Sequence, residues 1–190
     1  MENKEKILQS ASELFTEKGY DALSVRNIAK RANLSTIGIY SHFKGKQGIL
    51  NALCQRACEE LTDSILRASG NTASDKVLDA CENILRYAEV STAHYQLIFG
   101  ATPTFFTMSE DTITAKAKLV EAMAGLCKAL PKNQASDDKA MTIATQVMAL
   151  THGFIHFHQS NHTPLLNQDN WKDKAIQSVR LHVYAIVATQ

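Results

Sequence analysis

Apolar residues recur at helical spacing along almost the whole of this 190-residue chain, and the alternation expected of strands is nearly absent. Proline, which interrupts helices, occurs only three times, and glycine occurs eight times. A hydrophobic content of 45% is sufficient for a sizeable core. The sequence therefore predicts an all-α protein of about nine helices.

Three short helices are predicted before residue 47. The first ends where Gly19 can adopt the left-handed conformation of a helix C-cap. Ser24 can cap a second helix, which ends at Asn33, because asparagine also tolerates the left-handed conformation. Ser35 can cap a third helix over residues 35–41. Helix, cap, helix, a two-residue turn and a short polar helix form the layout of a helix-turn-helix.

The third predicted helix has little apolar surface to bury. Only Ile39 and Phe43, which are four residues apart, share a face toward a core. In a helix-turn-helix the second helix enters the DNA major groove, and this placement would account for the exposed polar face. The candidate base contacts are Thr36, Ile37 and Gly38, and the candidate phosphate contacts are Ser35, Tyr40, His42 and Lys46.

The charge distribution also indicates that the N-terminal end of the chain binds a partner. Residues 1–56 carry nine Lys or Arg against five Asp or Glu, whereas residues 57–190 carry eleven against fourteen. A basic end on an otherwise slightly acidic chain indicates an anionic partner. The alternative is an uninformative scatter of surface charge.

Residues 7–50 closely resemble the DNA-binding domain of the TetR family of transcriptional regulators. The resemblance rests on "ASELF", on "GY" at residues 19 and 20, on "SVRNIAKRA", on Ser35 and on "IYSHFKGK". It implies a homodimer that binds a palindromic double-stranded DNA operator and usually represses nearby genes. It also places Ser24 and Arg26 among the positions that contact DNA, together with Ser35, Thr36, Tyr40, His42 and Lys46.

The resemblance divides the chain into a DNA-binding domain at residues 1–46 and a ligand-binding and dimerisation domain at residues 47–190. Helical spacing in the second part predicts helices from about residue 46 to 65 and over 74–91, 93–100, 110–129, 136–158 and 168–188. The segments "YAEVSTAHYQLIFG" and "QVMALTHGFIHFH" resemble a C-terminal subtype of the family that is marked by a His-Gly pair in a late helix.

The last two predicted helices are apolar on wide faces, so they can serve both a core and a partner subunit. Pairing with their symmetry mates would give a four-helix dimer interface. The alternative is that they close only their own core. The candidate interface residues are Met148, Ile155, Trp171, Val179, Val183 and Ile186.

Aromatic residues are concentrated in "HYQLIFGATPTFFTM", residues 94–108. They could wall a pocket for a small apolar or aromatic effector, or form an aromatic core beneath a loop. The candidate pocket residues are His94, Tyr95, Phe99, Phe105, Phe106, Met108, His152 and Phe154.

Other chemistry has weaker support. His152 and His156 have a spacing that suits a metal, but no carboxylate or cysteine stands nearby in the sequence. We therefore predict no metal, no cofactor and no catalytic residue, although a His-metal enzyme and a non-specific DNA-binding helical protein are the alternatives. The four cysteines lack CxxC pairing and are expected to be reduced thiols in a cytoplasmic protein without a signal peptide, membrane span or membrane partner.

Overall fold

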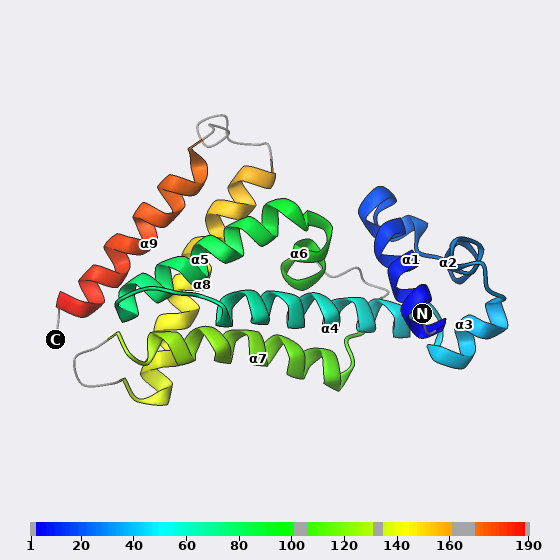
Figure 1. The fold of residues 1–190 in the computed structure, drawn as a ribbon, viewed down its shortest axis with the longest axis horizontal. Coiled ribbons are helices and arrows are strands. Elements are labelled where there is room, and N and C mark those ends of the chain that lie inside the picture. Colours follow the sequence, from blue (N-terminus) through cyan, green and yellow to red (C-terminus); the bar gives the residue numbers. More distant parts are fainter. Residues whose placement is uncertain (1–2, 101–105, 131–134, 161–169, 189–190) are drawn as a thin grey trace. The chain divides into compact units, whose positions relative to one another are not determined.

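The computed structural model describes residues 3–100, 106–130, 135–160 and 170–188, and all of their regular structure is helical. The predicted all-α fold is therefore confirmed. These described residues form nine α-helices and one 3-10 helix. The α-helices are labelled in Figure 1. Their bounds are α1 (Asn3–Lys18), η1 (Tyr20–Ala22), α2 (Val25–Ala32), α3 (Thr36–His42), α4 (Gly45–Leu66), α5 (Ala73–Val90), α6 (Thr92–Phe99), α7 (Glu110–Cys127), α8 (Asp137–Gln159) and α9 (Trp171–Ala188).

The helices begin and end within a few residues of the predicted positions because their ends carry local stop signals. Gly19 follows α1 with a φ of 68°, and Asn33 ends α2 with a φ of 54°. The 3-10 helix η1 was not predicted. Its Tyr20 ring packs edge-on against Phe15 of α1, with the ring centroids 4.9 Å apart. None of the described helices is both long and apolar enough to span a lipid bilayer.

The chain forms two compact units that are interleaved in sequence. The first unit contains residues 1–59 and 91–116, and the second contains residues 60–90 and 117–190. Both α4 and α7 therefore contribute residues to both units. This structural division differs from the predicted boundary after residue 46, which stays a prediction about where the functions lie.

The first unit is built around α1, which packs against η1, α2, α3 and α6. The buried face of α1 follows the spacing seen in the sequence. The α4 residues of this unit add a second apolar stripe. The main buried side chains are Ile7, Leu8, Leu14, Phe15, Ile28, Ile39, Phe43, Ile49, Leu50, Leu53, Leu97 and Ile98.

A polar network fixes the start of α7 to α4 within the first unit. The side-chain oxygen of Asn51 accepts hydrogen bonds from the backbone N–H of Ser109 at 2.8 Å and from the Thr112 hydroxyl at 2.7 Å. The amide nitrogen of Asn51 donates to the Thr107 carbonyl at 3.1 Å. Because Asn51 and Thr112 are buried, these bonds replace the hydrogen bonds to water that both side chains lose on folding.

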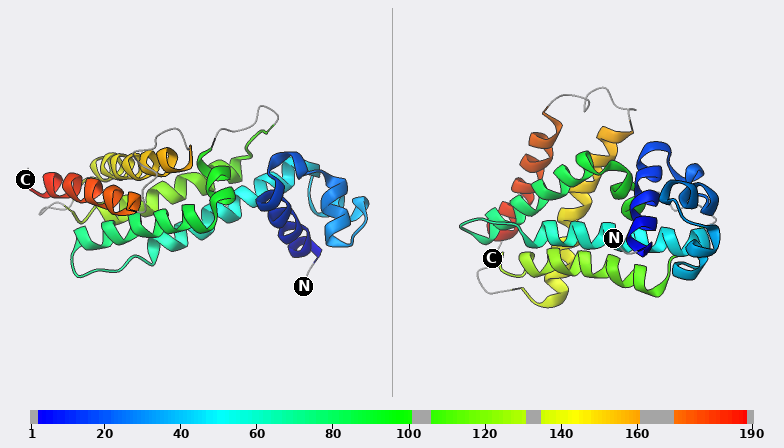
Figure 2. Two further views of the ribbon diagram at one scale, coloured as in Figure 1. Left: turned by 90° about the horizontal axis from the view of Figure 1, so that it is seen from above. Right: turned by 45° about the vertical axis from the view of Figure 1, so that its right-hand side comes forward.

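The second unit contains α5, α8 and α9, which pack pairwise against one another. Helices α8 and α9 lie side by side and antiparallel in Figure 1 and in both views of Figure 2. The buried side chains include Val77, Leu78, Ile84, Leu85, Met123, Val147, Ile155, Trp171, Val179 and Val183.

Candidate DNA-binding surface

The first turn of α3 is held by a side-chain cap. Ser35 is extended, with φ −76° and ψ 155°, and its hydroxyl accepts a hydrogen bond from the backbone N–H of Gly38 at 3.1 Å. Ser24 caps α2 in the same way, accepting from Asn27 at 3.1 Å. Both predicted N-caps are confirmed. Each cap satisfies one of the amides that a helix leaves unpaired at its start.

Two apolar residues anchor α3, and the rest of the helix faces outward. Ile39 and Phe43 are buried, as the four-residue spacing predicted. Ile37 is 80% exposed and Tyr40 is 62% exposed. This seven-residue helix therefore keeps an isoleucine and a tyrosine outside its own core, where a partner could contact them.

The turn between α2 and α3 sets the position of this surface. Asn33 adopts the left-handed conformation, with φ 54° and ψ 48°, and its N–H bonds to the carbonyls of Ala29 and Lys30. The N–H of Leu34 also bonds to Ala29, at 3.0 Å. These bonds close the last turn of α2 and leave one residue before the Ser35 cap, so α3 begins at a fixed point.

The turn after α3 requires glycine for two reasons. Gly45 has a φ of 73°, which disfavours any side chain, and a Cβ there would lie 3.2 Å from Cε1 of Tyr40. The Tyr40 ring therefore lies directly beside the backbone at Gly45. The sequence interpretation did not identify this support, although the "KGK" run is a visible turn signal.

Most of the predicted DNA contacts lie in water, as their proposed role requires. Ser24 and Gly38 are half-buried, and Lys46 is half-buried with its ammonium donating to the carbonyl of Tyr20 at 3.1 Å. Lys46 therefore contacts η1 in addition to any phosphate that it binds. Lys44, which was outside the predicted set, is exposed beside His42. The exposed predicted residues are Arg26, Ser35, Thr36, Ile37, Tyr40 and His42.

Ion pairs occupy two of the arginines in the N-terminal part of the chain. Arg31 on α2 binds Glu13 and Glu17 on α1, each with a nitrogen–oxygen distance of 2.8 Å. Its hydrogen bond holds the pKa of Glu17 below the ordinary value. Arg56 likewise pairs with Glu5. These arginines tie helices together, which leaves the exposed cations near α3 to account for attraction to an anion.

The predicted effector residues are distributed over both units. In the first, the Tyr95 and Phe99 rings pack at a tilt of 41° with their centroids 4.8 Å apart, and burial raises the pKa of Tyr95. His94 shares a 2.8 Å hydrogen bond with the Ser12 hydroxyl of α1. The remaining predicted residues of this unit are Phe106, which is buried, and Met108, which is half-buried. Phe105 lies outside the described residues, and His152 and Phe154 are half-buried in the second unit.

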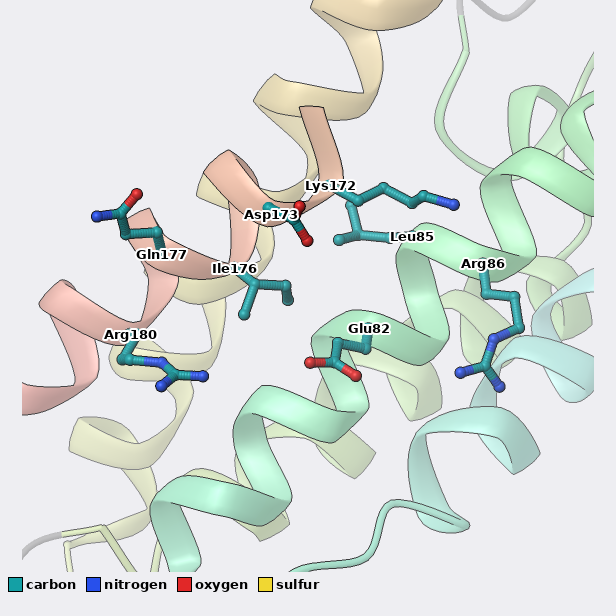
Figure 3. Close-up of a pocket in the computed structure, with 8 residues that line it drawn as sticks. All are labelled: Glu82, Leu85, Arg86, Lys172, Asp173, Ile176, Gln177 and Arg180. Atoms are coloured by element: carbon teal, nitrogen blue, oxygen red, sulfur yellow. The ribbon is translucent and has the colours of Figure 1, made fainter. Parts of the chain in front are cut away.

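A groove of about 640 Å³ opens between α5 and α9 in the second unit. Figure 3 shows Arg180 and Glu82 on the two helices, below the apolar Leu85 and Ile176 in this view. Lys172 at one end pairs with Glu89 at 2.8 Å. The sequence did not predict this groove, because its charged residues look like an ordinary solvated helix face. The complete lining is Glu82, Leu85, Arg86, Lys172, Asp173, Ile176, Gln177 and Arg180.

Four of the six predicted dimer residues lie in the chain's own core. Ile155, Trp171, Val179 and Val183 are buried, so they pack inside the second unit, and only Met148 and Ile186 are partly exposed. Trp171 stacks on His158 at 4.3 Å. The exposed large apolar residues of α8 and α9 are instead Met141, Phe157, Leu181 and Tyr184. The apolar spacing in the sequence identified the inward face of these helices. Core positions and interface positions use the same apolar residue types, so the spacing does not separate them.

The histidines of α8 do not form a complete metal site in the described part of the chain. The His152 and His156 rings are 6.3 Å apart between centroids. Burial, and then the neighbouring His156, lower the pKa of His152. Among the described residues, no group of three or more His, Cys, Asp or Glu side chains is arranged to hold a metal ion.

Comparisons with known proteins agree with the geometry of the first unit. Residues 7–53 match the model for bacterial regulatory proteins of the tetR family, and residues 77–178 match the tetracyclin repressor-like C-terminal domain. The chain is 34% identical over 88 residues to the probable HTH-type transcriptional regulator YttP of Bacillus subtilis, covering 44% of this chain and 42% of YttP. It is 31% identical over 100 residues to the HTH-type transcriptional activator FasR of Mycolicibacterium smegmatis, covering 52% of this chain and 46% of FasR.

The chain thus spans less than half the length of these two regulators. The crystal structure of a possible TetR family transcriptional regulator from Streptomyces coelicolor A3(2) covers 98% of this chain and 100% of its own, with a TM-score of 0.69 at 16% identity. That likeness shows that the fold is shared.

Proposed function

The chain belongs to the TetR family of bacterial regulatory proteins, and on that premise we propose that it is a sequence-specific DNA-binding transcriptional regulator that acts as a homodimer. The observation that carries this proposal is the capped helix α3, which is anchored by Ile39 and Phe43 while Ile37 and Tyr40 face water. Such a helix can enter the major groove of DNA without losing its hold on the protein.

The proposed contacts divide by their chemistry. Thr36 and Ile37 carry methyl groups and lie in the first turn of α3, so they are placed to read base edges. Tyr40 and His42 carry hydrogen-bond donors and lie farther along the helix, where they would bind phosphate and fix the register. Gly38 leaves room for the DNA to approach.

We assign repression as the direction of regulation because that is usual in the family, with release by a small apolar or aromatic effector. A contact route inside the first unit supports coupling to an effector: the Tyr95–Phe99 ring pair lies on α6, and His94 of the same helix bonds to Ser12 of α1. An effector that displaced these rings would act on the helix that supports α2 and α3. The effector must bind the DNA-free state more tightly than the DNA-bound state.

The proposed dimer uses the outward face of α8 and α9. Ala149 and Gly153 on α8 are small residues that allow helices to approach closely, and Leu181 on α9 is 65% exposed. An interface across a two-fold axis would bury this surface in both subunits and place two α3 helices on the two halves of a palindrome.

The test is a footprint on the DNA upstream of the protein's own gene, with competitor DNA and a series of salt concentrations. A protected palindromic patch that survives competition would support a sequence-specific dimer. Uniform binding that falls steeply with salt and shows no patch would instead support a non-specific DNA-binding protein, and a genome-wide selection of bound fragments would confirm that outcome.

A further inference from the structure

Two thiols on α4 lie one helical turn apart and take no part in the proposed function. All four cysteines are buried and none is in a disulfide. Cys54 and Cys58 are four residues apart on the same helix face, and both are 0% exposed. The Cys54 sulfur also donates to the Leu97 carbonyl of α6 at 3.6 Å.

The surroundings of the pair make the two thiols unequal. The hydrogen bond from Cys58, and then the positive charge of Lys116, lower the pKa of Cys54, while burial opposes them. The same hydrogen bond and burial raise the pKa of Cys58. The Lys116 ammonium is held in place by a 2.6 Å hydrogen bond to the Ile98 carbonyl. The pair therefore consists of two thiols of unequal acidity, one helical turn apart.

The spacing of the pair suits a bridging atom better than a disulfide. A disulfide brings its two Cβ atoms to about 3.8 Å, whereas residues four apart on a helix have Cβ atoms roughly 5 to 6 Å apart. Direct oxidation would therefore distort α4. One soft atom bonded to both sulfurs spans the gap with the helix intact, and thiolates select soft atoms of this kind.

We propose that Cys54 and Cys58 form a dithiol site for trivalent arsenicals. A monosubstituted arsenical with an As=O group forms one As–S bond to each sulfur. Its oxygen leaves as one water molecule that carries both thiol protons, and arsenic stays trivalent, so no oxidant or reductant is required. Because both thiols are buried, the reagent enters during local opening of the contact between α4 and α6.

The site lies in the same unit as the candidate DNA-binding surface. An adduct at Cys54 would remove its hydrogen bond to Leu97 on α6, and His94 of that helix is bonded to Ser12 on α1. This consequence rests on the proposed function: arsenical binding would lower the affinity for operator DNA. The binding step itself does not depend on it.

The first experiment is native mass spectrometry of the full chain with phenylarsine oxide. We expect one adduct whose added mass equals the reagent minus one water. Cys54→Ser and Cys58→Ser should each weaken binding at least 100-fold, because a single thiol cannot form the bridged product. Cys81→Ser and Cys127→Ser are the matched controls, since both of those thiols are also buried and should leave binding unchanged. Thermal melting of each variant checks that the fold is retained.

An absence of adduct on the folded wild-type chain would overturn the proposal, and so would an adduct that survives Cys54→Ser. Operator binding measured in parallel separates the two proposals. Loss of DNA binding in wild type but not in Cys58→Ser would support coupling to the DNA-binding surface. An adduct with unchanged DNA affinity would overturn that coupling, and failure of the untreated protein to bind any operator would refute the proposed function while the mass measurement still tests the site.

Discussion

Helix α3 and the α8–α9 pair both leave large apolar side chains in water, but the residues around those side chains differ. On α3 the exposed Ile37 and Tyr40 have Thr36 and His42 as neighbours, and Ser35 caps the helix. On α8 and α9 the exposed side chains share their faces with small residues, such as Ala149, Gly153 and Ala185.

This difference indicates two kinds of partner. Hydroxyl, imidazole and backbone N–H groups around an exposed side chain suit a charged, hydrogen-bonding surface such as DNA. Small residues around an exposed side chain suit close contact with another helix. Exposure alone does not tell a nucleic-acid surface from a protein surface, and we expect the neighbouring residues to do so. The following experiments test whether this distinction holds.

The largest effect is expected from two substitutions on the same helix. Ile39→Ala removes a fully buried side chain and should lower the free energy of unfolding by about 3 kcal/mol. Ile37→Ala removes an exposed side chain and should change it by roughly 0.5 kcal/mol or less, while altering the preferred operator sequence. Urea unfolding and a selection of bound DNA sequences measure the two effects. Equal destabilisation by both variants would mean that α3 packs differently from its position in this structure.

A second pair of substitutions addresses the α8 face. A Cβ atom added at Gly153 would meet nothing within 4 Å in the single chain, and the same is true of Gly125 on α7. Gly153→Leu should raise the dimer dissociation constant at least about 100-fold, or roughly 2.7 kcal/mol, because the added side chains would meet across the interface. Gly125→Leu is the control. Sedimentation velocity reports the dissociation constant, and a Gly153→Leu protein that dimerises normally would place the interface elsewhere.

Two tyrosines provide a smaller test. Tyr40→Phe removes only a hydroxyl and should weaken DNA binding about tenfold on every sequence, because a hydrogen bond to a charged phosphate contributes about 1.5 kcal/mol. Tyr184→Phe makes the same chemical change on α9, where the side chain is also exposed. Fluorescence anisotropy with operator and scrambled DNA should show weaker binding by Tyr40→Phe and unchanged binding by Tyr184→Phe. If both variants bound like wild type, the Tyr40 hydroxyl would not be a phosphate contact.

The smallest effect concerns two helix caps. Ser35→Ala and Ser136→Ala each remove a hydroxyl that accepts a backbone N–H, at 3.1 and 3.3 Å respectively. Each should lower the free energy of unfolding by about 1 kcal/mol. Only Ser35→Ala should also weaken operator binding, because only that cap begins α3. A matching loss of DNA affinity in Ser136→Ala would show that general destabilisation, and not the cap itself, is responsible.

Local signals explain why the helices were predictable. Ser24, Asn33 and Ser35 act through their own backbone and the next few residues, so their roles can be read directly from the sequence. The apolar spacing of Ile39 and Phe43 likewise identified the buried face of α3. The DNA contacts themselves depend on a partner that the chain does not contain, and they stay predictions.

Long-range contacts explain what the sequence did not show. Asn51 looks like an exposed polar residue in α4, and it is buried only because residues 107–112 return to cover it. The groove between α5 and α9 is lined by side chains that are about ninety residues apart in the sequence. The residues predicted for the dimer interface were chosen from the apolar spacing of α8 and α9, and several of them, such as Val179, are buried in the chain's own core. Apolar residues at helical spacing look the same in a single sequence whether they face the core or a partner subunit.

The interleaved order of the two units has a consequence during synthesis. The first unit is completed by residues 91–116, so the ribosome releases α1, α2 and α3 long before the chain that completes their unit exists. Until residue 112 emerges, Asn51 has no Thr112 hydroxyl to bind. Nascent chains arrested between residues 60 and 90 should therefore be sensitive to protease, and resistance should appear only once α7 has left the exit tunnel.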